Sequence, residues 1–120
     1  MDQVVIAVVA VFFAGMGIYA LAAPASLIAT FGITLPTADG RNEVRAVYGG
    51  FGLAVAAALA LACYDVGLRD GIVLTVALAL AGMAAGRVVS MAVERPSRFY
   101  PTVFYLLVEA ALSAALLAVR

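Results

Sequence analysis

The sequence predicts an all-α integral membrane protein, in which four transmembrane helices form a bundle and a short interfacial helix lies between spans one and two. Of its 120 residues, 67% are hydrophobic and 12% are charged, which leaves too little polar surface to cover a water-soluble fold. The apolar residues gather in four runs, each close to the ~20 residues that cross the core of a bilayer. Short segments rich in proline, glycine and charge separate these runs, so we expect one transmembrane domain over residues 1–120.

The first span is predicted at about 4–23, directly before Pro24. The sequence ahead of it lacks the positively charged segment that opens a secretory signal, so we interpret this run as a retained span. The interval that follows is too short and too interrupted to cross a membrane. Within it, residues 26–31 precede Gly32, a pattern typical of a short helix with glycine at its C-terminal end. We expect this helix to lie at the membrane interface.

The other three spans are predicted at about 44–64, 71–93 and 101–119. A polar turn precedes the second span, and the third ends at the charged segment that begins with Glu94 and closes with Pro96. The connections between the last three spans are short, so these helices are expected to run antiparallel to their sequence neighbours.

Glycines lie where neighbouring helices are expected to approach each other closely. Gly49, Gly50 and Gly52 fall near the start of the second span, and Gly82 and Gly86 lie four residues apart on the third. In lipid, helices associate mainly through close packing, which small residues permit. We expect these glycines to serve packing within one bundle. Pairing of two copies of the chain through Gly82 and Gly86 is the alternative.

Arginines predict which side of the membrane each loop faces. An even number of spans puts both termini on one side, together with Arg69 and Arg120. The opposite side, formed by the first and third loops, carries more arginines: Arg41, Arg45, Arg95 and Arg98. Because positively charged loops stay in the cytoplasm, we predict a multi-pass protein of the bacterial inner (cytoplasmic) membrane with both termini outside the cytoplasm.

Several classes of function are excluded by what the sequence lacks. It has no histidine, which removes a histidine metal site and a Ser-His-Asp triad, and Cys63 is its one cysteine. No nucleotide-binding glycine motif occurs, and seven basic residues balance seven acidic ones without a basic tract. We therefore predict no catalytic residue, no metal ligand, no cofactor and no nucleic-acid partner.

Two residues of opposite charge, Arg87 and Glu109, each lie inside a predicted span. Arg87 precedes the end of the third span by about two turns, and Glu109 follows the start of the fourth by a similar length, so both lie roughly 10 Å below the same membrane face. Charges in a bilayer require partners. The matched depth on antiparallel neighbours predicts an Arg87–Glu109 ion pair.

Further polar residues share helix faces with these charges. Ser90 follows Arg87 by three residues, and Tyr105 precedes Glu109 by four. Arg45, in the same half of the membrane, has Tyr48 three residues later. The predicted ligand-binding or structural polar cluster therefore has six members: Arg45, Tyr48, Arg87, Ser90, Tyr105 and Glu109.

A resemblance to a known family rests on the segment from Arg45 to Gly52, which reads RAVYGGFG, on Asn42 before it, and on Gly86, Arg87 and Glu109. With these residues, the chain resembles over nearly its whole length a family of small four-span bacterial membrane proteins known as a domain of unknown function (4345 type). The resemblance implies a four-helix inner-membrane protein and supplies no activity.

Two functions are compatible with this sequence. The first is a structural or accessory subunit of a membrane complex, with the bilayer and a larger complex or a second copy as partners, and Arg87–Glu109 as an internal clamp. The alternative is a transporter or binder of a small anionic or proton-coupled ligand at an intramembrane Arg/Glu site. A membrane-embedded enzyme is the least supported, because no nucleophile–base pair is present.

Overall fold

The computed structural model describes residues 2–120, and every regular element among them is helical. Four helical stretches are long and apolar enough to cross a membrane, judged by length and composition. The predicted fold class, an all-α bundle of four long apolar helices, is confirmed, and the chain is a multi-pass membrane protein. The elements are α1 (Asp2–Ala22), α2 (Pro24–Ala29), α3 (Ala38–Val44), a π-helical segment η1 (Arg45–Gly50), α4 (Phe51–Tyr64), α5 (Val66–Val93) and α6 (Thr102–Val119).

Two of the spans begin earlier than their apolar runs. The second is one continuous helix over Ala38–Tyr64, formed by α3, η1 and α4, where the apolar run starts at residue 44. Its first turn is stabilised by Thr37, whose hydroxyl accepts a hydrogen bond from the Gly40 N–H at 3.2 Å. Asp65 does the same for α5, accepting from the Leu68 N–H at 3.2 Å. Capping side chains thus extend both helices into polar sequence.

The short α2 begins at Pro24, where a proline suits the first turn because the helix needs no N–H there. The chain leaves this segment at Gly32, whose φ of +76° is a left-handed conformation that glycine adopts without strain. The helix predicted at 26–31 therefore starts and ends two residues earlier, with the same length of six residues. Its location at a membrane interface stays a prediction.

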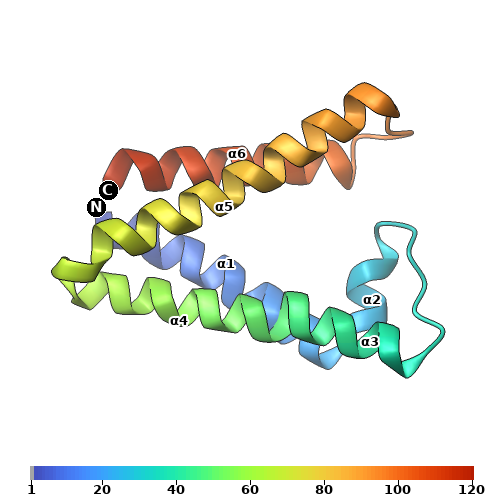
Figure 1. The fold of residues 1–120 in the computed structure, drawn as a ribbon, viewed down its shortest axis with the longest axis horizontal. Coiled ribbons are helices and arrows are strands. Elements are labelled where there is room, and N and C mark those ends of the chain that lie inside the picture. Colours follow the sequence, from blue (N-terminus) through green and yellow to red (C-terminus); the bar gives the residue numbers. More distant parts are fainter. Residues whose placement is uncertain (1) are drawn as a thin grey trace.

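The four long helices are arranged as two antiparallel pairs, α1 with α4 and α5 with α6 (Figure 1). Both chain ends and the turn between α4 and α5 lie at one end of the molecule, called here the termini end. The elements α2 and α3 and the loop before α6 lie at the other, called here the loop end (Figure 1). The two pairs come together at the termini end and spread apart toward the loop end.

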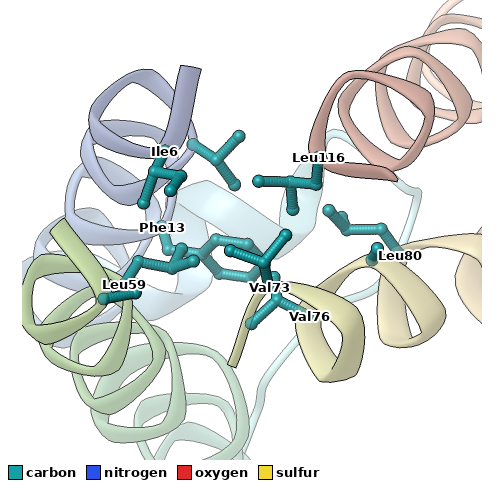
Figure 2. Packing of buried hydrophobic residues seen from close by; sticks show 10 residues of the cluster. Ile6, Phe13, Leu59, Val73, Val76, Leu80 and Leu116 are labelled. Carbon is teal, nitrogen blue, oxygen red and sulfur yellow. The ribbon is translucent and has the colours of Figure 1, made fainter. Parts of the chain in front are cut away.

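The shared hydrophobic core lies in the half of the molecule nearer the termini end. Ile6 from α1, Leu59 from α4, Val73 from α5 and Leu116 from α6 meet there, each fully buried (Figure 2). A second, smaller cluster ties the loop-end elements to α1 and consists of Ala20, Leu27, Ile28 and Val44. No residue of α5 or α6 belongs to that second cluster, so this apolar core does not extend to the α5–α6 pair.

Glycines bring α1 and the second span into close contact. A Cβ added to Gly17 would lie 2.9 Å from the Gly49 carbonyl oxygen, and one added to Gly52 would lie 3.1 Å from the Phe13 carbonyl oxygen. These positions have room for a hydrogen atom and little more. Gly82 and Gly86, in contrast, have no neighbour within 4 Å of an added Cβ. Within the described chain, the close packing expected of glycine is found at the α1 crossing and not at this pair.

Arginine side chains satisfy carbonyl groups at two helix ends. The Nε of Arg45 donates to the Leu21 carbonyl at 3.1 Å, at the end of α1. Arg69 donates from Nε to the Ala62 carbonyl at 2.8 Å and from Nη2 to the Cys63 carbonyl at 2.9 Å, at the end of α4. The last carbonyls of a helix have no partner within it, and a positive charge there also complements the helix dipole.

The glycine crossing predicts a difference between two identical substitutions. Gly17→Ala forces α1 away from η1, and overpacking of this kind destabilises by about 1–3 kcal/mol. The matched control is Gly82→Ala, where the methyl group meets open space and alanine favours the helix. Unfolding of both variants in mixed micelles measures the difference. Equal stability of the two variants would contradict the crossing.

Candidate functional site: an arginine–glutamate contact beside a cavity

The charged groups of α5 and α6 are in direct contact. Arg87 donates from Nε to Oε1 of Glu109 at 2.8 Å and from Nη2 to Oε2 at 3.1 Å. Both carboxylate oxygens are therefore engaged in the parallel, two-bond geometry that makes arginine–carboxylate pairs strong and directional. The side chain of Glu109 is 3% exposed and that of Arg87 is 24% exposed.

The helices that carry this pair run antiparallel, which matches the two residues in height. Arg87 is separated from the last residue of α5, Val93, by about 9 Å of helix, and Glu109 lies about 10 Å beyond the first residue of α6, Thr102. The pair thus joins α5 to α6 in the half nearer the loop end, beyond the shared hydrophobic core.

Two aromatic rings flank the guanidinium group. The Cζ atom of Arg87 lies 5.7 Å from the ring centroid of Tyr105 and 5.9 Å from that of Phe31. The rings of Phe31 and Tyr105 are themselves 5.6 Å apart. Because Phe31 follows α2, this contact connects the loop-end elements with the α5–α6 pair. Cation–π attraction adds to the ion pair in holding the arginine.

A second connection at the loop end lies outside the spanning helices. The side chain of Thr30 is the main reason that the pKa of Tyr100 is lowered from its usual value. The side chain of Tyr105 and the charge of Arg98 lower this pKa further, while burial opposes them. The segment after α2 therefore meets the α5–α6 pair at Tyr100 as well as at Phe31.

The arginine–glutamate pair forms part of the wall of a cavity of about 200 Å³, called here the polar cavity. Its polar lining comes from η1, α5 and α6 and consists of Tyr48, Arg87, Tyr105 and Glu109. Its apolar lining comes from α1, α2, the following loop and α5 and consists of Met16, Leu27, Ile28, Phe31, Ile33 and Met83. Both helix pairs contribute, so the cavity occupies the space where the pairs diverge.

Four of the six residues of the predicted polar cluster, those named above, are brought together around this cavity. The other two lie elsewhere. Arg45 turns toward the end of α1, where it donates to Leu21. Ser90 is exposed and does not line the cavity. Whether these residues bind a ligand stays a prediction.

Residues of the cavity that the sequence did not single out are apolar. Phe31, Met16 and Met83 carry no signal in a chain as hydrophobic as this one, because such side chains fit a core, a lipid face and a cavity equally well.

Ser113 lies outside the cavity and links two helices. Its buried hydroxyl donates to the Ala77 carbonyl at 2.8 Å, which joins α6 to α5 one turn from Glu109.

Within residues 2–120, no group of three or more His, Cys, Asp or Glu side chains is arranged to hold a metal ion. The arrangement offers ion-pair and hydrogen-bond chemistry instead: a guanidinium, a carboxylate and two phenol groups beside an apolar wall.

Fold and site together define a small four-helix membrane protein with a charged pair facing a cavity. Residues 1–119 match the family model described as a domain of unknown function (DUF4345), and the chain belongs to this family. The resemblance drawn from the sequence is thereby confirmed. No match was found among curated proteins or among solved structures.

The unequal burial of the pair predicts unequal effects of removing either partner. Arg87→Leu leaves the nearly fully buried carboxylate of Glu109 without its counter-charge, and breaking a buried pair in this way costs about 3–5 kcal/mol. Glu109→Leu is expected to cost less stability, because the unpaired guanidinium of Arg87 lies on the wall of the polar cavity.

The double variant, Arg87→Leu with Glu109→Leu, removes both charges and is expected to recover most of the loss. Unfolding of the three variants in mixed micelles gives the coupling between the residues. If the double variant loses as much stability as the two single variants together, or more, the result contradicts this account.

Proposed function

We propose that this protein binds a small anionic, proton-coupled ligand at the Arg87–Glu109 site inside the bacterial inner membrane. The observation that carries the proposal is the cavity of about 200 Å³ beside the pair. A pair that serves architecture alone needs no open space next to it. The shared hydrophobic core near the termini end, in contrast, consists of packed side chains. Arginine is also the side chain best suited to recognise a carboxylate or phosphate group.

The chemistry follows from the sum of charges in the site. Arg87 and Glu109 cancel, so an anion that entered without compensation would leave a net negative charge in a medium of low dielectric constant. The site stays neutral when the anion takes the place of the carboxylate at Arg87 and Glu109 takes up one proton. Tyr48 and Tyr105 are the other titratable groups that line the cavity, and the Tyr48 hydroxyl is available as a donor to the anion.

The one-proton exchange predicts how binding depends on pH. Benzoate, which is ionised between pH 6 and pH 8, is expected to lose about tenfold in affinity for each unit of rising pH, because one proton binds with each anion. Glu109→Gln removes this dependence. Equilibrium dialysis of radiolabelled benzoate against the protein in nanodiscs measures both.

Arg120→Gln serves as the matched control, because Arg120 pairs with Asp70 at an exposed site away from the cavity. It is expected to keep the affinity and the pH dependence of the unaltered protein. An affinity that does not change with pH in the unaltered protein would overturn the proton coupling, and the absence of any benzoate binding would overturn the proposed function.

An accessory or structural subunit is the second candidate. It is favoured by the completeness of the pair, since Arg87 occupies both carboxylate oxygens and no buried side-chain polar atom in the described chain lacks a partner. In that case the neutral double variant keeps both the fold and the cellular role, and no ligand binds.

The orientation proposed for the membrane has both termini outside the cytoplasm. The excess of arginine in the first and third loops supports it. Because Cys63 is the one cysteine, Cys63→Ala gives a background for single-site labelling.

In that background, Val66→Cys is expected to react with a membrane-impermeant maleimide in spheroplasts, since Val66 is 74% exposed at the turn between α4 and α5. Ser97→Cys, in the loop before α6, is expected to react after the membrane is permeabilised. The reverse pattern would overturn the orientation.

A further inference from the structure

The polar cavity is the first of three cavities that adjoin one another. A second cavity, of about 470 Å³, shares Met16, Tyr48 and Met83 with it. A third, of about 430 Å³, shares Phe13, Phe51 and Met83 with the second. Met83 lines all three. We call the second and third cavities together the α4–α5 groove, because most of their walls come from those two helices.

The α4–α5 groove is long and apolar. Along α5 it runs from Met83 back to Gly71, a separation of 12 residues or about 18 Å of helix. Thr75 is the polar side chain on this stretch of the wall, and its hydroxyl already donates to the Gly71 carbonyl at 2.8 Å. The groove therefore offers no free donor beyond Tyr48, and its shape and polarity match an alkyl chain.

The groove opens toward the outside of the molecule. Phe51 and Met83, on opposite walls, are 58% and 42% exposed. The helices α4 and α5 also diverge toward the loop end (Figure 1). In a membrane protein this side faces lipid, so a molecule that is dissolved in the bilayer reaches the polar cavity laterally without crossing water.

Charge limits what the head of such a molecule can be. Arg87 and Glu109 are the charged residues that line the three cavities, and their charges cancel. A neutral molecule that carries its own acidic proton fits this balance. A phospholipid does not, because its phosphodiester group brings a negative charge with no proton to transfer.

Building on the proposed function, we propose that the ligand is a long-chain monocarboxylic acid, with its carboxyl group at Arg87 and Glu109 and its alkyl chain in the α4–α5 groove. On binding, the O–H bond of the acid breaks and its proton forms an O–H bond with Glu109. The ligand carboxylate takes over the guanidinium of Arg87, so charge and protons balance with no further reactant.

Photolabelling tests this assignment. The probe is palmitate with a diazirine at the far end of its chain, added to the protein in nanodiscs and mapped by mass spectrometry. The expected label falls on α4 and α5 near Thr75, which lies 12 residues or about 18 Å of helix from Arg87. Unlabelled palmitate displaces the probe at least tenfold better than hexadecanol at the same mole fraction, because the alcohol has no carboxylate for Arg87.

Two pairs of variants make the test specific. Ala58→Phe puts a bulky ring into the groove and is expected to abolish the label near Thr75. Ala111→Phe makes the same change on the exposed face of α6 and leaves the label unchanged. The double variant Arg87→Gln with Glu109→Gln, which keeps the site neutral, is expected to lose the preference for palmitate over hexadecanol.

Equal displacement by hexadecanol and palmitate, or unchanged labelling of Ala58→Phe, overturns the inference. Benzoate separates this failure from failure of the proposed function, since its binding requires the polar cavity and no groove. Benzoate bound with the pH dependence given above, together with unspecific palmitate labelling, retains the site and removes the long-chain ligand. Failure of both probes removes the site as well.

Discussion

The bidentate contact between Arg87 and Glu109 is the interaction on which the loop-end half of this molecule depends. The shared hydrophobic core gathers all four long helices near the termini end, and the smaller loop-end cluster includes no residue of α5 or α6. Beyond the core, the ion pair joins α5 to α6. One turn away, at the core itself, the Ser113 hydroxyl donates to the carbonyl of the core residue Ala77. A charged contact thus joins this helix pair where the bundle opens.

The opening itself follows from how the two helix pairs are built. Gly17, Gly49 and Gly52 allow α1 and the second span to pack in close contact, which makes this pair tight. The α5–α6 pair is joined by the ion pair of Arg87 and Glu109, and these two residues line the polar cavity together with Met16 of α1. Two internally tight pairs that share a core at one end leave space at the other, and Phe31 bridges that space at its edge.

The sequence was sufficient for the four spans, because a bilayer demands long apolar runs, and for the meeting of Arg87 with Glu109, because depth on antiparallel helices follows from residue counts. It was insufficient for the cavity. The residues that line it, such as Met83 and Phe31, are apolar, as most residues of this chain are, so the sequence does not mark them. The size of the cavity depends on how far the two helix pairs diverge. The place of Arg45 could not be predicted for a related reason. Its side chain donates to the Leu21 carbonyl, and a backbone carbonyl has no signature in the sequence.

The unequal burial of the two charges bears on whether the pair is architecture or a site. A clamp gains most when both partners are sealed from solvent, yet the guanidinium of Arg87 remains 24% exposed on the cavity wall while the carboxylate of Glu109 is 3% exposed. In the proposed function, the arginine is therefore the partner that an incoming anion meets first, and the carboxylate behind it is the group that the anion displaces. Neutralising that carboxylate by a proton costs less than leaving it charged and unpaired in an apolar environment. In the proposed function, the burial of Glu109 is therefore the reason that exchange at Arg87 is coupled to a proton on Glu109.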